Sequence, residues 1–277
     1  MSNVVRKNAQ TTVVFVKIGT ASILNGGKVD RRVAKGVARD IIGLWGTKTD
    51  FGENTKFVLV TSGARELGRL TPDDDPRTAA SRGQPKLIAA YNKHFRWYNR
   101  SNRFLGRPQV HVSQILVETS HLHDDPETGI TSAVVRALRE DTLPIINEND
   151  PLASKETTLG DNDKLTAEIA TRLGGSDKGV NVGAVVFMSI KNGNGAEQAA
   201  GTGGGESKAE AAKEIRDKSI VPLIVDGKES HVIKKVLRGG KVSDVAKSDA
   251  EELISTLRTG SSAADLGRPA TFPHVSV

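Results

Sequence analysis

Cysteine is absent from this sequence of 277 residues. A disulfide framework and a thiolate metal site are therefore excluded. Aromatic residues make up only 4% of the chain, which argues against the stacked aromatic surface that single-stranded nucleic-acid binders use. No apolar run approaches the ~20 residues of a membrane span, and residues 1–10 lack the apolar stretch of a secretory signal. We expect a cytoplasmic protein without a membrane segment.

The positive charge of the chain points to anionic ligands. The formal net charge is +6, which favours either nucleic acid or small anions such as nucleotide phosphates and carboxylates. The basic residues are spread along the chain, and no nucleic-acid recognition motif accompanies them. Small anions are therefore the preferred interpretation, and we expect no nucleic-acid partner.

Short apolar runs alternate with helical patterns, which is typical of βαβ units and a mainly parallel sheet. The sequence therefore predicts an α/β fold. Strands are predicted at 12–19, 57–60, 110–117, 143–146, 184–189 and 221–225, and helices at 30–45, 76–102, 132–140, 163–173, 207–218 and 231–237. Residues 259–277, with a Gly-Ser-Ser run and two prolines, are expected to form a flexible tail.

Polar residues and glycines follow five of the predicted strands. They are Lys17–Thr20, Thr61–Ala64, Asn147–Asp150, Ser189–Gly193 and Asp226–Gly227. In a parallel sheet, ligands gather beyond the carboxyl ends of the strands. One or two of these segments are expected from ordinary turns, whereas all five together indicate a binding site.

Two of these strand ends have the chemistry of anion ligands. Lys17 ends a nearly continuous apolar strand, and a buried lysine needs an anion to offset its desolvation. Gly19 lets the following backbone approach a phosphate, although Lys17 would also fit the sequence if its amine reached solvent. Ser62 and Gly63 suit a carboxylate or phosphate, because the G-x-S-x-G pattern of a serine nucleophile is missing.

A glycine-rich segment, GTGGGESK at 201–208, precedes a predicted helix. Successive glycines let backbone N–H groups converge on an anion, and the helix N-terminus adds partial positive charge. The P-loop pattern is absent from the chain. The alternative is a flexible glycine loop that happens to meet a helix.

Two further segments are rich in carboxylates and amides, Asn147–Asp150 and Gly160–Asp163. Such a density suits an amino group, a Mg²⁺ shell or the ordering of nearby lysines. The alternative is that Asp161 or Asp163 caps the following helix. A His/Asp tract at 121–125 lacks the spacing of known metal ligands, so no protein metal site is predicted.

These motifs together resemble the amino acid kinase superfamily and, within it, the glutamate 5-kinase family. The resemblance covers residues 11–240 and is carried by Val16–Thr20, Val60–Ala64, PIINEND at 144–150, GDND at 160–163 and GTGGGESK ending at Lys208. It implies a three-layer α/β/α sandwich around a mainly parallel sheet. It also implies one kinase domain over residues 1–258, with a glutamate-binding N-terminal part and a nucleotide-binding part at about 165–250.

The resemblance implies ATP-dependent phosphorylation of the side-chain carboxylate of L-glutamate with Mg²⁺, the first step of proline biosynthesis, by a dimer or tetramer. Lys17 and Lys208 match lysines on either side of the transferring phosphate, and Asp163 matches the aspartate that orients them. The implied glutamate contacts are Ser62, Asn147, Asn149, Asp150, Asp161 and Asn162. The implied nucleotide contacts are Lys17, Ser189, Ile190, Thr202, Gly203, Gly204, Gly205, Glu206, Ser207 and Lys208.

The sequence departs from the family pattern in three places. The family's Thr-Asp pair after the fourth strand is Ser189-Ile190 here, and only a few residues separate Gly193 from Gly201. The family's methionine after the double glycine is Gly205. The C-terminal RNA-binding-type (PUA) domain of many members is not found. A kinase of this fold with another small acceptor, or a non-catalytic binding or regulatory relative with a reduced nucleotide lobe, therefore remain alternatives.

Overall fold

The computed structural model describes residues 10–122, 129–152, 161–176, 178–190 and 205–239, with the side chains of residues 205 and 206 left out. A mainly parallel sheet has the strand order β6-β7-β5-β1-β8-β9, and β4 lies antiparallel beside β5. Its strands are β1 (Thr11–Ile18), β4 (Thr47–Thr49), β5 (Gly52–Thr61), β6 (His111–Val117), β7 (Thr142–Glu148), β8 (Val180–Ser189) and β9 (Val221–Asp226).

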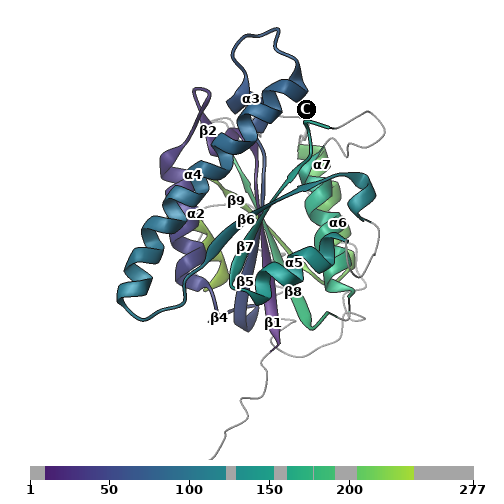
Figure 1. The fold of residues 1–277 in the computed structure, drawn as a ribbon. Helices are drawn as coiled ribbons and strands as arrows, with labels where there is room; N and C mark the ends of the chain where they lie inside the picture. Colours follow the sequence, from purple (N-terminus) through teal and green to yellow (C-terminus); the bar gives the residue numbers. More distant parts are fainter. Residues whose placement is uncertain (1–9, 123–128, 153–160, 177, 191–204, 240–277) are drawn as a thin grey trace, which may run out of the picture.

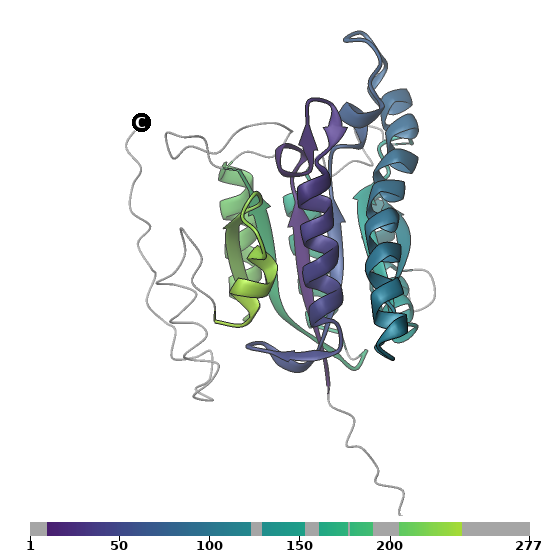
Figure 2. The same ribbon diagram turned by 90° about the vertical axis from the view of Figure 1, so that its left-hand side faces the viewer.

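Helices cover both faces of this sheet (Figures 1 and 2). One face carries α2 (Arg31–Leu44), α4 (Pro76–Phe104) and α8 (Val232–Leu237), and the other carries α5 (Ile130–Arg139), α6 (Asn162–Gly174) and α7 (Gly205–Asp217). Two short helices, α1 (Thr20–Ile23) and α3 (Ala64–Gly68), follow β1 and β5, and Thr119–Leu122 forms a 3₁₀ turn. The predicted three-layer α/β/α architecture is confirmed.

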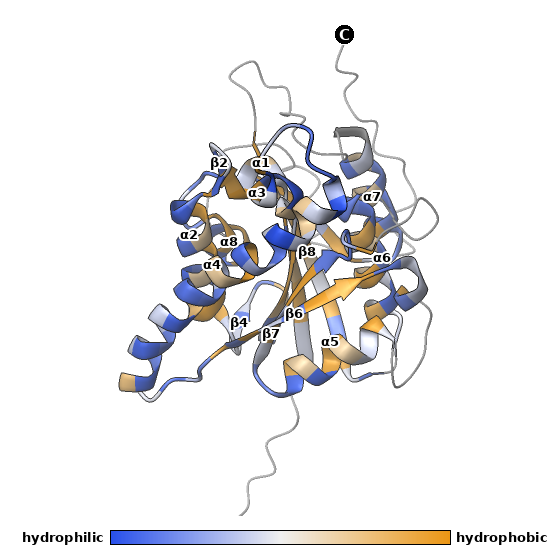
Figure 3. Ribbon diagram, turned by 45° about the horizontal axis from the view of Figure 1, so that its top comes forward, coloured by the Kyte–Doolittle hydropathy of each residue, from blue (hydrophilic) through white to orange (hydrophobic). Residues whose placement is uncertain are grey.

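The core consists of the central strands and the helix faces turned towards them, which appear as orange bands in Figure 3. Residues 13–16 of β1 are completely buried, because parallel strands with helices on both faces read as continuous apolar runs. Asp30 caps α2 as its sequence predicts, since its Oδ1 accepts a hydrogen bond from the backbone N–H of Arg32 at 2.9 Å. The apolar stripe of α2 packs against the sheet below it.

Several short elements were not predicted from the sequence. A hairpin of β2 (Leu24–Asn25) and β3 (Lys28–Val29) lies between α1 and α2. β4 is also new, and β5 begins at Gly52 rather than at residue 57. Strands of two or three residues carry no readable alternation, and the polar start of β5 is ordered by pairing with β1, where Thr11 opposes Asn54.

The five predicted strand ends meet at one edge of the sheet. Ile18 lies opposite Thr61, and Ser189 lies opposite Asp226. Because the strands run in parallel, their carboxyl ends point the same way, and the β2–β3 hairpin and α3, which come after β1 and β5, lie at the top of the molecule in Figure 1. Among the helices of the described ranges, none combines the length and apolarity that a bilayer-spanning helix requires. The predicted tail at 259–277 lies outside the described residues.

Candidate active site

Two lysines share one buried carboxylate at this edge of the sheet. Lys17 Nζ lies 2.5 Å from Asp163 Oδ1, and Lys208 Nζ lies 3.5 Å from Asp163 Oδ2. Asp163 is fully buried, and both lysines are 6% exposed. The three side chains come from the end of β1, the first turn of α6 and the first turn of α7. The structure thus brings together three residues that lie far apart in the sequence.

The loop before α6 is tied to the start of α7. Asp161 is the N-cap of α6, since its Oδ1 accepts from the backbone N–H of Asp163 at 2.8 Å. Its other oxygen accepts a hydrogen bond from the Ser207 hydroxyl. Burial raises the pKa of Asp161, as does the charge of Asp163, while Lys17 and Lys208 lower it. Asp161 therefore caps α6, as the alternative interpretation of the sequence expected, and it also ties α6 to the start of α7 beside the lysines.

Asn162 gathers the residues expected to contact the acceptor. Its Nδ2 donates to the Thr61 carbonyl oxygen at 2.9 Å, to Ser62 Oγ at 2.8 Å and to Asn147 Oδ1 at 2.9 Å. The amide cluster of Ser62, Asn147 and Asn162 therefore joins the ends of β5 and β7 to the start of α6. Since Asp163 follows Asn162 directly, the cluster borders the two lysines.

This cluster holds polar atoms that are buried without a partner. Asn147 Nδ2 and Asn162 Oδ1 are both inaccessible to solvent and make no hydrogen bond within the described part of the chain. A buried donor or acceptor left unpaired is destabilising by about 1–3 kcal/mol. The cluster therefore contains one donor and one acceptor that no described residue satisfies.

Two of the predicted acceptor contacts have other partners. Asn149 Nδ2 donates to Glu118 Oε1 at 2.6 Å, which ties it to the end of β6. Asp150 Oδ1 accepts from Arg65 Nε at 2.9 Å and from Arg65 Nη2. Arg65 was not predicted as a site residue, although a charged side chain in the first turn after Thr61–Ala64 is the signal that would have indicated it.

The predicted nucleotide contacts are described only in part. Ser189 ends β8, and its carbonyl oxygen accepts from the backbone N–H of Gly227 at 2.7 Å. A Cβ at Gly19 would lie 3.7 Å from Lys17 Nζ, so the glycine leaves space beside that ammonium group. Thr202, Gly203 and Gly204 lie outside the described residues, as does the side chain of Glu206.

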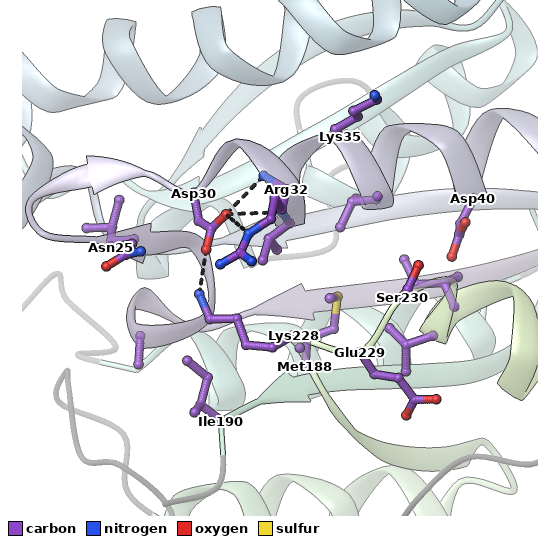
Figure 4. Close-up of a pocket in the computed structure, with 18 of the residues that line it drawn as sticks. Asn25, Asp30, Arg32, Lys35, Asp40, Met188, Ile190, Lys228, Glu229 and Ser230 are labelled. Carbon is purple, nitrogen blue, oxygen red and sulfur yellow. Dashed lines mark hydrogen bonds and ion pairs between the residues drawn. The ribbon is translucent and has the colours of Figure 1, made fainter.

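A separate cavity of about 1020 Å³ lies between the β2–β3 hairpin, α2 and the turn into α8 (Figure 4). Ile190 lines it, whereas Lys17, Asp163 and Lys208 do not. Two of its charged side chains form an ion pair, since Lys228 Nζ lies 2.9 Å from Asp30 Oδ2. We assign no ligand to this cavity.

In the ranges that the structure describes, no three His, Asp or Glu side chains converge in a way that would hold an ion. Residues 123–125 of the His/Asp tract lie outside those ranges.

Comparisons with known proteins bear on the family. The chain matches no family model. It is 27% identical over 259 residues to a glutamate 5-kinase of Alkaliphilus metalliredigens, covering 82% of this chain and 92% of that enzyme. It is 29% identical over 256 residues to a glutamate 5-kinase of Shewanella oneidensis, covering 81% of this chain but only 64% of the longer enzyme.

Among solved structures, the chain is similar to carbamate kinase from Giardia lamblia bound to AMP-PNP. The TM-score is 0.50 at 12% identity, over 84% of this chain and 98% of that one. This likeness concerns the fold alone, and it agrees with the three layers and mainly parallel sheet seen here. The chain is similar in sequence to glutamate 5-kinases and has the amino acid kinase fold.

Proposed function

We propose that this protein is a kinase that transfers the γ-phosphoryl group of ATP to the side-chain carboxylate of L-glutamate. The observation that carries the proposal is the pair of buried lysines on Asp163, directly beside the amide cluster of Ser62, Asn147 and Asn162. Asn162 would contact the acceptor, and Asp163, the next residue of α6, would hold the two cations that neutralise the transferring phosphoryl group.

The proposed roles follow from the charges. Asp163 holds one ammonium group on each of its oxygens, which keeps Lys17 and Lys208 on either side of one point. Phosphoryl transfer requires positioning and neutralisation of the phosphate oxygens more than covalent chemistry by the protein. Two lysines held at separate positions can contact the transferring group from opposite sides.

In the reaction, an oxygen of the glutamate side-chain carboxylate forms a bond to the γ-phosphorus. The bond from that phosphorus to the bridging oxygen breaks, and its electron pair leaves with ADP. The acceptor carboxylate is already ionised near neutral pH, so no general base is needed. The product is γ-glutamyl phosphate, which would commit glutamate to proline biosynthesis.

ATP is proposed to bind on the side of β8, β9 and α7, within the nucleotide-binding part at about 165–250, with its γ-phosphate at the two lysines. The rest of the kinase domain over 1–258 is proposed to hold glutamate. Mg²⁺ supplies further neutralisation of the phosphate charge when it is bound with ATP. Both oxygens of Asp163 face lysines, and those of Asp161 face Ser207 and a backbone N–H. We therefore propose that the phosphate oxygens of ATP are the principal ligands of Mg²⁺.

We also propose a cytoplasmic location, a homo-oligomeric state of two or four subunits, and the absence of nucleic-acid and membrane partners.

The decisive assay traps the product chemically. The protein is incubated with ATP, Mg²⁺, glutamate and hydroxylamine, and γ-glutamyl hydroxamate is measured, because hydroxylamine attacks the acyl phosphate. Hydroxamate that depends on both ATP and glutamate is expected. ADP release with another small acceptor but not with glutamate would favour a different kinase of this fold. Glutamate binding without any turnover would favour a non-catalytic relative.

A further inference from the structure

An arginine stands beside the carboxylate expected to contact the acceptor. Arg65 lies in the first turn of α3, and Asp150 lies just beyond the end of β7. Arg65 Nε donates to Asp150 Oδ1 at 2.9 Å, and Nη2 donates to the same oxygen. Both hydrogen bonds therefore fall on one oxygen of the carboxylate, which leaves Oδ2 for another donor.

Arg65 also has N–H groups that its hydrogen bonds to Asp150 do not use. A guanidinium group has five N–H bonds in a planar fork, and the two hydrogen bonds to Asp150 use only two of them. The Arg65 side chain is 34% exposed, whereas that of Asp150 is 11% exposed. The guanidinium can thus receive a further anion from the side that remains open.

The surroundings make this ion pair more than a surface contact. Burial raises the pKa of Asp150, and the charges of Glu148 and Glu66 raise it further, while Arg65 lowers it. Arg65 thus favours the ionised form of a carboxylate that lies near two other acids. A lone carboxylate would attract any ammonium group, whereas the pair presents one cation beside one anion.

We propose that Arg65 determines acceptor specificity by binding the α-carboxylate of an amino acid whose α-ammonium group is bound by Asp150 Oδ2. This inference rests on the proposed function and names the part of the acceptor that each charge recognises. The pair is complementary to a zwitterion, with a planar fork suited to a carboxylate. Acceptors that lack either charge leave one member of the pair without its ligand.

Three acceptors separate the two charges. Glutamate carries both, glutarate lacks the ammonium group, and 4-aminobutyrate lacks the α-carboxylate. We expect Arg65→Met to weaken the binding of glutamate and of glutarate by about 10- to 100-fold, as the loss of a charge-assisted hydrogen bond does. Binding of 4-aminobutyrate should change less than about threefold, because no group of this ligand faces Arg65.

A substitution of Asp150 should affect the ligands that carry an ammonium group instead. Asp150→Asn is expected to weaken glutamate and 4-aminobutyrate, while glutarate binding stays the same or improves. Arg65→Lys should restore part of the glutamate affinity, since it returns the charge without the fork. Arg69→Met removes an exposed arginine at the end of the same helix and should leave all three affinities unchanged.

Titration calorimetry on the whole protein gives the affinities without ATP, and hydroxamate formation gives the KM values. An equal loss of affinity for all three ligands in Arg65→Met would overturn the proposal, because a purely structural role acts on them alike. If that variant does not fold, Arg65→Gln, which retains donors to Asp150 without the charge, takes its place. If the variants show the expected selectivities but the wild type forms no hydroxamate, only the proposed kinase activity is overturned. If the wild type does not bind glutamate, the kinase activity and the role of Arg65 are both overturned.

Discussion

Lys208 is the residue whose proposed role is most sharply testable. Its ammonium group shares Asp163 with Lys17 and is buried at the start of α7. If it neutralises charge that develops on the transferring phosphoryl group, its loss should lower kcat with little effect on glutamate binding. We expect Lys208→Ala to reduce kcat by roughly 10²- to 10³-fold, as removal of one such donor does in other enzymes.

The matched control for Lys208→Ala is Lys213→Ala, an exposed lysine on the same helix, which should leave kcat unchanged. Hydroxamate formation at saturating substrates gives kcat, and calorimetry gives the glutamate affinity. Wild-type turnover in Lys208→Ala would remove this lysine from the reaction.

Asp150 predicts a pH dependence of glutamate binding. Burial raises the pKa of its carboxyl group above the usual aspartate value, which is about 4. The ionised form binds an ammonium group, so binding is complete above the raised pKa and is lost as the pH falls through it. We expect the KM for glutamate to increase on acidification while the pH is still above about 4.

Asp150→Asn isolates that carboxyl group from the titration of glutamate itself. This variant should have a higher KM near neutral pH and a flatter profile on acidification. Parallel profiles for the two proteins would show that another group is responsible.

For individual residues, the sequence predicts the role of a side chain better than it predicts the residues that the side chain contacts. The buried cation at Lys17 and the capping ability of Asp161 could be inferred from an apolar strand and an Asx residue before a helix. The hydrogen bond of Asn149 to Glu118 and the pairing of Arg65 with Asp150 could not. They depend on which loops become neighbours and on side-chain conformation, neither of which leaves a local pattern in the sequence.

Among the elements, α3 carries Arg65 and is held against α4 by two glycines. A Cβ at Gly83 of α4 would lie 1.8 Å from the carbonyl oxygen of Ala64, and one at Gly68 would lie 1.8 Å from that of Ala79. The two backbones are therefore in direct contact. Gly83→Ala should destabilise the protein by about 1–3 kcal/mol through overpacking and, by displacing α3, raise the KM for glutamate.

Gly43→Ala provides the control, because Gly43 lies in α2 with no atom within 4 Å of a built Cβ. That change should stabilise the protein by about 0.5–1 kcal/mol through a lower cost of helix formation. Urea unfolding followed by circular dichroism measures both. Equal free energies of unfolding for Gly83→Ala and Gly43→Ala would mean that α3 can move away from α4 without a loss of stability.

The main helices and strands followed from periodicity because each is long enough to repeat its apolar spacing. The N-terminus of α2 was located correctly because Asp30 is a strong capping residue. The hairpin β2–β3 and strand β4 were missed, since two or three residues contain too little pattern. The contact of α3 with α4 was hidden for another reason: a glycine within a predicted helix does not reveal what lies against it.

For the molecule as a whole, α6 connects the proposed acceptor and nucleotide halves. Its first residue, Asn162, binds the ends of β5 and β7, and its second, Asp163, binds Lys17 of β1 and Lys208 of α7. In the sheet, β1 lies between β5 and β7 on one side and β8 and β9 on the other. The parallel topology could be predicted from alternating elements, whereas the convergence on one helical turn required the three-dimensional structure.

Stability and ligand binding should therefore be coupled through Asp163. Asp163→Asn removes the carboxylate between two buried lysines, and breaking such a buried ion pair costs about 3–5 kcal/mol, or roughly 10 °C in Tm for a chain of this size. An anion that binds between the lysines would replace the missing charge, so sulfate or ADP should raise the Tm of Asp163→Asn by more than that of the wild type. Asp73→Asn, at an exposed loop position, should respond to these anions as the wild type does. Thermal unfolding against ligand concentration measures the coupling, and an equal rise in all three proteins would mean that Lys17 and Lys208 do not face a bound anion.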